Sequence, residues 1–153
     1  MGLNKEVINI QNPVLGAYLI WNFTIGYEKK TPFILLFPVL PMLYRADMLE
    51  KLKSTYTNSG LKAFASKLPD DCLLNIQNFA LSMRKLTLHS IQIASRTQLV
   101  SVTDDGYVHS LSSSTHKSEP KGVKELERYA VKLGKWCSEV SLYEISTILK
   151  IRF

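Results

Sequence analysis

Histidine and cysteine are the side chains in this 153-residue sequence that would most readily carry catalysis or hold a metal. The three histidines, His89, His109 and His116, fall on a predicted helix surface, a predicted strand and a polar segment. No two of them have the HxxxH spacing of a metal site, so each is interpreted as a surface residue. The two cysteines, Cys72 and Cys137, form no CxxC pair, which favours core packing over a zinc site or a disulfide framework.

Cofactor-binding motifs are also missing from the sequence. No Walker-type glycine-rich loop is present to hold the phosphates of ATP. Asp104-Asp105-Gly106 begins like a calcium loop, but no carboxylates follow at alternate positions and no glutamate closes it, so a turn explains it better. We therefore expect a protein that is not an enzyme and that uses no cofactor, no metal and no small-molecule substrate.

The first predicted element is a buried helix. Asn12 followed by Pro13 is a typical helix start, and the helix is expected to end near Tyr27. Its body contains only two polar residues, so no solvated face can be drawn on it.

The next stretch, 32–44, is apolar throughout and is broken by Pro38 and Pro41. A membrane-spanning helix needs roughly 20 residues, so we interpret this stretch as a strand-like or kinked helical segment of the core. Because it and the preceding helix are apolar all round, either they pack on each other or another chain covers some of their surface. The residues expected at such a partner interface are Trp21, Phe33, Leu36, Phe37, Leu40, Leu43 and Tyr44.

A group of helices followed by a hairpin occupies the middle of the sequence. The predicted helices are 46–52, 59–67, 70–84 and 87–96. Two short β-prone runs, 99–103 and 107–111, flank Asp104-Asp105-Gly106 and predict a β-hairpin. Three helices followed by a hairpin is the order of a winged helix-turn-helix.

The apolar periodicity assigns faces to the last two of these helices. In the first of them, the residues expected to face the core are Leu73, Ile76, Phe79, Ala80 and Met83. In the second, Leu88, Ile91 and either Ala94 or Ser95 are expected to face the core, and the outward set is His89, Ser90, Gln92 and Arg96.

The C-terminal end of the sequence predicts two more helices. The polar segment 112–121 is interpreted as a linker, and a long amphipathic helix begins at about Gly122. Ser141 and Glu144 form a capping box that begins the final helix. The expected fold class is mostly α (α+β), a helical domain containing a winged-helix-like unit with one small β-hairpin. We expect a single domain made of an apolar helical region (1–57), a winged-helix-like region (58–111), the linker (112–121) and C-terminal helices (122–153).

The charge balance allows an acidic partner. Lysine and arginine number 19 and aspartate and glutamate 13, which gives a net charge of +6. The residues suited to contact DNA are Arg84, Lys85, His89, Gln92 and Arg96. Asp104 and Asp105 oppose such contact, because they place two negative charges at the tip of the predicted hairpin. The winged-helix-like unit could therefore serve a free-standing DNA-binding transcriptional regulator or a protein-docking surface.

Composition and the first residues indicate a location. Apolar residues make up 46% and charged residues 21% of the sequence, the balance of a soluble globular protein. The opening residues lack the apolar stretch of a signal peptide, and no basic amphipathic face flanks 33–44. We therefore expect a cytoplasmic protein without membrane association.

Several short motifs resemble a known family. Asn12-Pro13, the Gly26-Tyr27 pair and the LLFPVLPMLY block are similar to the opening of the middle component of three-component ABC-ATPase conflict systems, the group that includes Lamassu-type bacterial defence. Leu133-Gly134-Lys135-Trp136 and the closing run 148–152 are similar to that family's C-terminal signature. The similarity covers nearly the whole sequence.

The sequence departs from this family at three positions. Lys150 stands where the family tends to have glycine, Phe153 where it tends to have proline, and Cys137 where an aromatic residue is usual. The resemblance implies a non-enzymatic adaptor that links an SMC-like or Rad50-like ATPase subunit to an effector subunit, such as a nuclease, in an anti-phage or anti-plasmid complex. DNA would then be reached through the complex.

Overall fold

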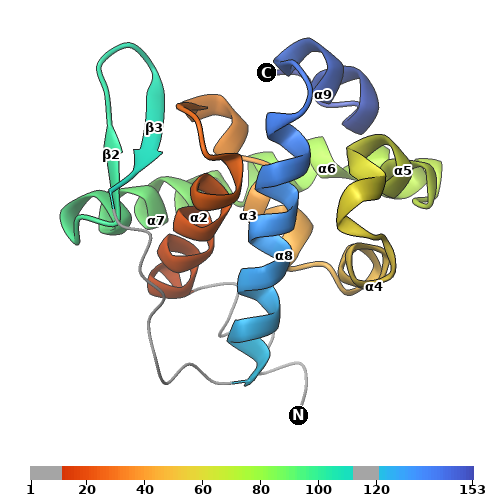
Figure 1. The fold of residues 1–153 in the computed structure, drawn as a ribbon, viewed down its shortest axis with the longest axis horizontal. Coiled ribbons are helices and arrows are strands. Elements are labelled where there is room, and N and C mark those ends of the chain that lie inside the picture. The colour runs from red at the N-terminus through yellow and green to blue at the C-terminus, as the bar shows by residue number, and fades with distance from the viewer. Residues whose placement is uncertain (1–11, 112–120) are drawn as a thin grey trace.

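A central helix, α2, organises the fold, and elements from the whole length of the sequence pack around it (Figure 1). A computed structural model describes residues 12–111 and 121–153. The helices in these ranges are α2 (Pro13–Tyr27), α3 (Val39–Leu43), α4 (Ala46–Ser54), α5 (Gly60–Ser66), α6 (Asp70–Ser82), α7 (Arg84–Arg96), α8 (Lys121–Ser138) and α9 (Leu142–Leu149). The 3-10 turns are η1 (Phe33–Leu36) and η2 (Thr57–Ser59), and the strands are β1 (Thr31–Pro32), β2 (Val100–Val102) and β3 (Tyr107–Ser110). The predicted fold class, mostly α with a small amount of β, is confirmed.

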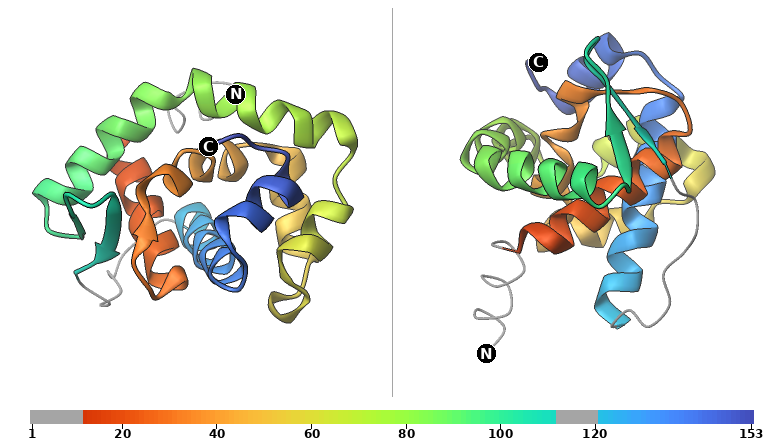
Figure 2. Two further views of the ribbon diagram at one scale, coloured as in Figure 1. Left: turned by 90° about the horizontal axis from the view of Figure 1, so that it is seen from above. Right: turned by 90° about the vertical axis from the view of Figure 1, so that its left-hand side faces the viewer.

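Helix α2 begins as the sequence predicts. The Asn12 side chain accepts hydrogen bonds from the amides of Val14 (3.0 Å) and Leu15 (3.3 Å), and Pro13 is the first helical residue. The helix packs against α7 and α8 along most of its length and also contacts β3 (Figures 1 and 2). Because neighbours surround it, it has no face for polar side chains, which explains its apolar sequence.

Two glycines bring the backbones of α2 and α8 together. A Cβ atom added to Gly26 would lie 2.9 Å from the Cα of Val131 and closer still to the Val131 carbonyl oxygen. A Cβ atom added to Gly134 would lie 2.9 Å from the amide nitrogen of Tyr27 and closer still to the Phe23 carbonyl oxygen. Each helix therefore supplies a glycine at the point where the backbone of the other passes.

Small side chains line the contact between α2 and α7. A Cβ atom added to Gly16 would lie 3.0 Å from the Cβ of Ser90 and closer still to the Ser90 hydroxyl oxygen. Ser90 is fully buried, and the prediction that it faces solvent is therefore wrong. The position opposite Gly16 leaves room only for a small side chain, which serine provides. The larger Leu88 is 40% exposed, which corrects the prediction that it faces the core.

The apolar stretch after α2 forms three short pieces: β1, η1 and α3. Pro38 precedes α3 and Pro41 falls in its first turn, where a proline removes no helical hydrogen bond. The large side chains of this stretch that are at most 1% exposed are Leu35, Leu36, Leu40 and Leu43. The sequence left open whether these segments pack on each other or are covered by another chain. These four side chains pack inside the chain's own core.

Helix α8 holds the segment that contains α4 and η2. The Lys132 ammonium donates hydrogen bonds to the carbonyl oxygens of Leu52 (2.8 Å) and Thr55 (3.0 Å), at the end of α4. The Trp136 indole donates to the carbonyl oxygen of Thr57 (2.7 Å). Partial burial lowers the pKa of Lys132. These bonds satisfy carbonyl groups that have no partner within α4 itself.

Helices α6 and α7 run end to end and form one arch along a side of the molecule (Figure 2). Only Met83 separates them, and the inward residues continue across this joint at steps of three and four: Leu73, Ile76, Ala80, Met83, Thr87, Ser90 and Ala94. A helix-turn-helix requires two helices that meet at a steep angle across a turn of a few residues. With one residue between α6 and α7, the structure has no turn of that length there, and the winged-helix unit stays a prediction.

Phe79 lies outside the inward stripe of α6. Its side chain is 39% exposed, and the Arg45 guanidinium lies 4.4 Å from the centroid of its ring. The same guanidinium pairs with the Asp47 carboxylate at 2.9 Å. The prediction that Phe79 faces the core is wrong, because the stripe passes through its neighbour Ala80.

The predicted hairpin is confirmed, and it carries a third strand. Strands β2 and β3 pair antiparallel with Val102 opposite Val108, and Gly106 in the turn has a φ of 88°. Strand β1 pairs with the other side of β3, so the order in the sheet is β1-β3-β2. Strand β1 could not be predicted from the sequence, because a strand of two residues has no periodicity to recognise.

The capping box at the start of α9 is also confirmed. The Glu144 amide donates to the Ser141 hydroxyl (3.1 Å), and the Ser141 amide donates to the Glu144 carboxylate (3.3 Å). After α9 the chain returns to α6, where the Arg152 amide donates to the Gln77 side chain at 2.7 Å (Figure 2). The last residues thus lie beside the α6–α7 arch.

The regions 1–57, 58–111 and 122–153 expected from the sequence pack against one another. Helix α2, from the expected region 1–57, packs on α7 and α8, which belong to 58–111 and 122–153. The expected linker 112–121 lies outside the described residues except for Lys121, the first residue of α8, and His116 also lies outside them.

A search of the described ranges for membrane-spanning helices found none, since each helix there is too short or too polar to cross a bilayer.

The close approach of α2 and α8 generates a stability prediction. Gly134→Ala should lower the free energy of unfolding by about 1–3 kcal/mol, because the new methyl group overlaps backbone atoms of α2 that cannot move independently. Lys135→Ala, at the next and exposed position of α8, is the control and should change stability by about 0.5 kcal/mol or less. Urea denaturation of both variants measures the difference. Equal or greater stability of Gly134→Ala would show that the helices are not in this contact.

The bonds from Lys132 generate a second prediction. Lys132→Met keeps an unbranched side chain, one atom shorter, but removes both hydrogen bonds to the end of α4, and it should lower the free energy of unfolding by about 1–3 kcal/mol. Lys135→Met changes the same charge at an exposed site and should have little effect. Thermal unfolding followed by circular dichroism distinguishes the two, and a similar midpoint for both variants would count against the assigned role.

Candidate functional site

Reactive side chains do not gather in the described ranges of the chain. No group of three or more histidine, cysteine, aspartate or glutamate residues that could hold a metal ion was found there. His89 is exposed on α7 and His109 is half-buried on β3. Burial raises the pKa of the Cys137 thiol to about 12 and also raises that of Cys72, which donates to the Asp47 carboxylate at 3.4 Å. Both cysteines are therefore protonated near neutral pH, which makes them poor nucleophiles.

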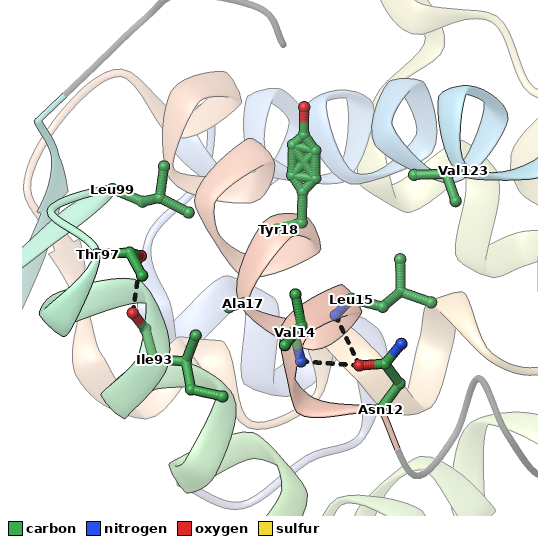
Figure 3. A pocket seen from close by; sticks show the side chains of 9 residues that line it. All are labelled: Asn12, Val14, Leu15, Ala17, Tyr18, Ile93, Thr97, Leu99 and Val123. Carbon is green, nitrogen blue, oxygen red and sulfur yellow. Dashed lines mark hydrogen bonds between the residues drawn. The ribbon is translucent and has the colours of Figure 1, made fainter. Parts of the chain in front are cut away.

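A hollow of about 460 Å³ lies beside the start of α2 (Figure 3). The described residues that line it are mostly apolar and include no histidine, cysteine, aspartate or glutamate. Two of its polar groups are used within the chain: the Asn12 side chain caps α2, and the Thr97 hydroxyl donates to the Ile93 carbonyl at 2.8 Å (Figure 3). The hollow thus offers apolar contact area and few groups that could take part in a reaction.

The residues predicted for a partner interface divide into two sets. Four of the seven are at most 1% exposed and belong to the core: Trp21, Leu36, Leu40 and Leu43. The other three are half-buried, and Phe33 and Tyr44 among them pack against the core: Phe33, Phe37 and Tyr44. The first set must be removed from the predicted interface, because a partner could touch these side chains only if the core opened.

The residues predicted for DNA contact lie together on α7. All five are exposed: Arg84, Lys85, His89, Gln92 and Arg96. The last four recur at steps of three and four residues and share one face, whereas Arg84 lies on the neighbouring face with Leu81 and Leu88. Asp104 and Asp105 are exposed at the hairpin tip, as the sequence indicated.

Exposed apolar residues of the arch form a surface that the sequence analysis missed. Leu74, Leu81 and Leu88 are spaced seven residues apart, and each directly follows a buried residue of the inward stripe. Their exposed fractions are 59%, 60% and 40%. The interval of seven residues is the signal in the sequence that could have indicated this surface, but the apolar periodicity placed Leu88 on the inward face.

Two hollows follow this surface. The first, of about 240 Å³, is lined by Leu81 and Arg84 on the arch and by Ile34, Phe37, Arg152 and Phe153 opposite. The second, of about 620 Å³, is lined by Leu88, Gln92 and Arg96 on the arch and by Phe33 and Val102 opposite. We call these two hollows together the arch groove. It combines exposed apolar side chains with arginines, a composition typical of surfaces that bind other proteins.

Comparison with known protein families gives a match over residues 2–153, to the family described as ABC-three component (ABC-3C) system Middle Component 3. No curated protein and no solved structure matches the chain. The family match confirms the resemblance that the sequence motifs indicated, and two of those motifs contain Gly26 and Gly134, which lie at the contact between α2 and α8. Since the match covers nearly the entire sequence, the chain belongs to the Middle Component 3 family of ABC three-component systems.

Proposed function

We propose that this chain is a non-catalytic adaptor that links an SMC-like or Rad50-like ABC ATPase to an effector such as a nuclease. The observation that carries the proposal is membership, over nearly the whole sequence, in a family of middle components. A middle component of a multi-component system has protein partners, and an adaptor between two partners needs contact surface more than reactive groups. The exposed apolar side chains of the arch groove support such a role.

The complex would act in defence against phages or plasmids, of the Lamassu type. This aspect of the proposal rests on the similarity of the motifs at the two ends of the sequence to that group. The buried and protonated cysteines support the absence of a catalytic role for this chain.

Co-expression with the ATPase and the third component encoded beside this chain tests the adaptor role. The three proteins should co-elute in size-exclusion chromatography, and the ATPase and the third component should separate when this chain is omitted. An ATPase and a third component that co-elute equally well without this chain would contradict the linking role. Failure of this chain to co-elute with either of them would contradict the adaptor role altogether.

Direct binding of DNA by α7 is the alternative function. The observation that favours it is the row of exposed polar and basic residues from Lys85 to Arg96, on a helix that contains no aspartate or glutamate. If it is correct, replacing Arg84, Lys85 and Arg96 together by alanine should weaken binding to duplex DNA and reduce its dependence on salt. Fluorescence anisotropy with the isolated chain measures both, and unchanged affinity in the triple variant would exclude this function.

A further inference from the structure

We propose that the arch groove binds an amphipathic helix of another component of the system, one that carries a stripe of apolar residues flanked by aspartate and glutamate. The inference rests on the proposed adaptor function and gives it a surface and a partner chemistry. It departs from the interface expected from the sequence, whose central residues belong to the core.

The apolar surface of the groove has the form that a partner helix requires. Leu81 and Leu88 stand on one side and Ile34, Val102 and Phe153 on the other, and each is between 40% and 60% exposed. A helix that lies in an apolar groove inserts side chains at intervals of three, four and seven residues. The seven-residue interval from Leu81 to Leu88, about 10 Å along the arch, matches two turns of such a helix.

The two hollows lie next to each other along the arch. Arg84 lines the first and Leu88 the second, and these residues are one helical turn apart on the same face. On the opposite wall the neighbours Ile34 and Phe33 line the first and the second hollow. One extended partner element can therefore occupy both.

The charge of the groove selects an acidic partner. Arg84 and Arg152 line the first hollow and Arg96 the second, while no aspartate or glutamate of the described residues lines either. The sequence from Cys72 to Thr103, which includes most of the arch, contains no acidic residue. Arginines beside an apolar surface favour carboxylates at the edge of a bound helix and disfavour basic partners.

The same groove is poorly suited to nucleic acid. Leu81, at 60% exposed, would face a phosphate backbone with which it makes no favourable contact. A protein helix can give the leucines apolar contacts and the arginines carboxylate partners, whereas DNA would give partners only to the arginines.

The test uses the full chain with the ATPase and the third component encoded beside it. Leu81→Glu combined with Leu88→Glu places two charges on the apolar surface of the groove and should weaken binding to one of these two proteins by roughly 30-fold or more. Tyr56→Glu combined with Tyr143→Glu is the matched control, because these residues are 79% and 80% exposed and line neither hollow. Biolayer interferometry with each purified partner measures the affinities.

A second variant guards against loss of folding. Arg84→Glu combined with Arg152→Glu changes two exposed side chains and should weaken the same interaction, most strongly at low salt. Lys53→Glu combined with Lys135→Glu makes the same change of charge away from the groove and should leave binding intact.

The outcomes separate this inference from the function on which it rests. Assembly of the wild-type chain together with unchanged binding of both groove variants would overturn the inference and leave the adaptor role standing. Groove variants that keep their protein partners but lose affinity for a DNA duplex would also overturn it, in favour of nucleic acid. If the wild-type chain binds neither component, the proposed function fails and the inference fails with it.

Discussion

The close contact between the backbones of α2 and α8 is the constraint on which the rest of this fold depends. Gly26 and Gly134 let the two helices approach until each meets the main chain of the other. Overlaps of this kind cannot be relieved by rotating a side chain, so the relative position of the helices is tightly limited. Once α2 is fixed on α8, its other side is available to α7, where Gly16 and Ser90 make a second close approach.

This arrangement explains how a chain rich in apolar segments buries most of them without a partner. Helix α2 is surrounded by α7, α8 and β3, and the leucines of η1 and α3 belong to the same core. The arch made by α6 and α7 must turn its inward stripe to this core and so turns Leu81 and Leu88 outward. Partner binding through the groove would then use a surface that is already formed in the isolated chain, with little reorganisation on association.

Local signals in the sequence predicted the individual elements well. Asn12 and Pro13 marked the start of α2, the Asp-Gly turn marked the hairpin, and Ser141 with Glu144 marked α9, because each signal acts over only a few residues. The candidate surface was harder to predict, because the exposure of Trp21, Leu40 or Leu88 depends on which helices meet. The rotation of α7 places the small side chain of Ser90 opposite Gly16, and the apolar periodicity of α7 alone does not reveal that pairing.

Hydrogen–deuterium exchange of the isolated chain, compared with the chain bound to its ATPase and third component, tests this account most directly. We expect α2 and the stretch from Leu35 to Leu43 to be strongly protected in the isolated chain, and binding to add protection mainly on α6, α7 and residues 151–153. Rapid exchange of α2 and of Leu35 to Leu43 in the isolated chain, with protection that arises only in the complex, would contradict it. That result would mean that a partner completes the core, as one of the two interpretations of the sequence had allowed.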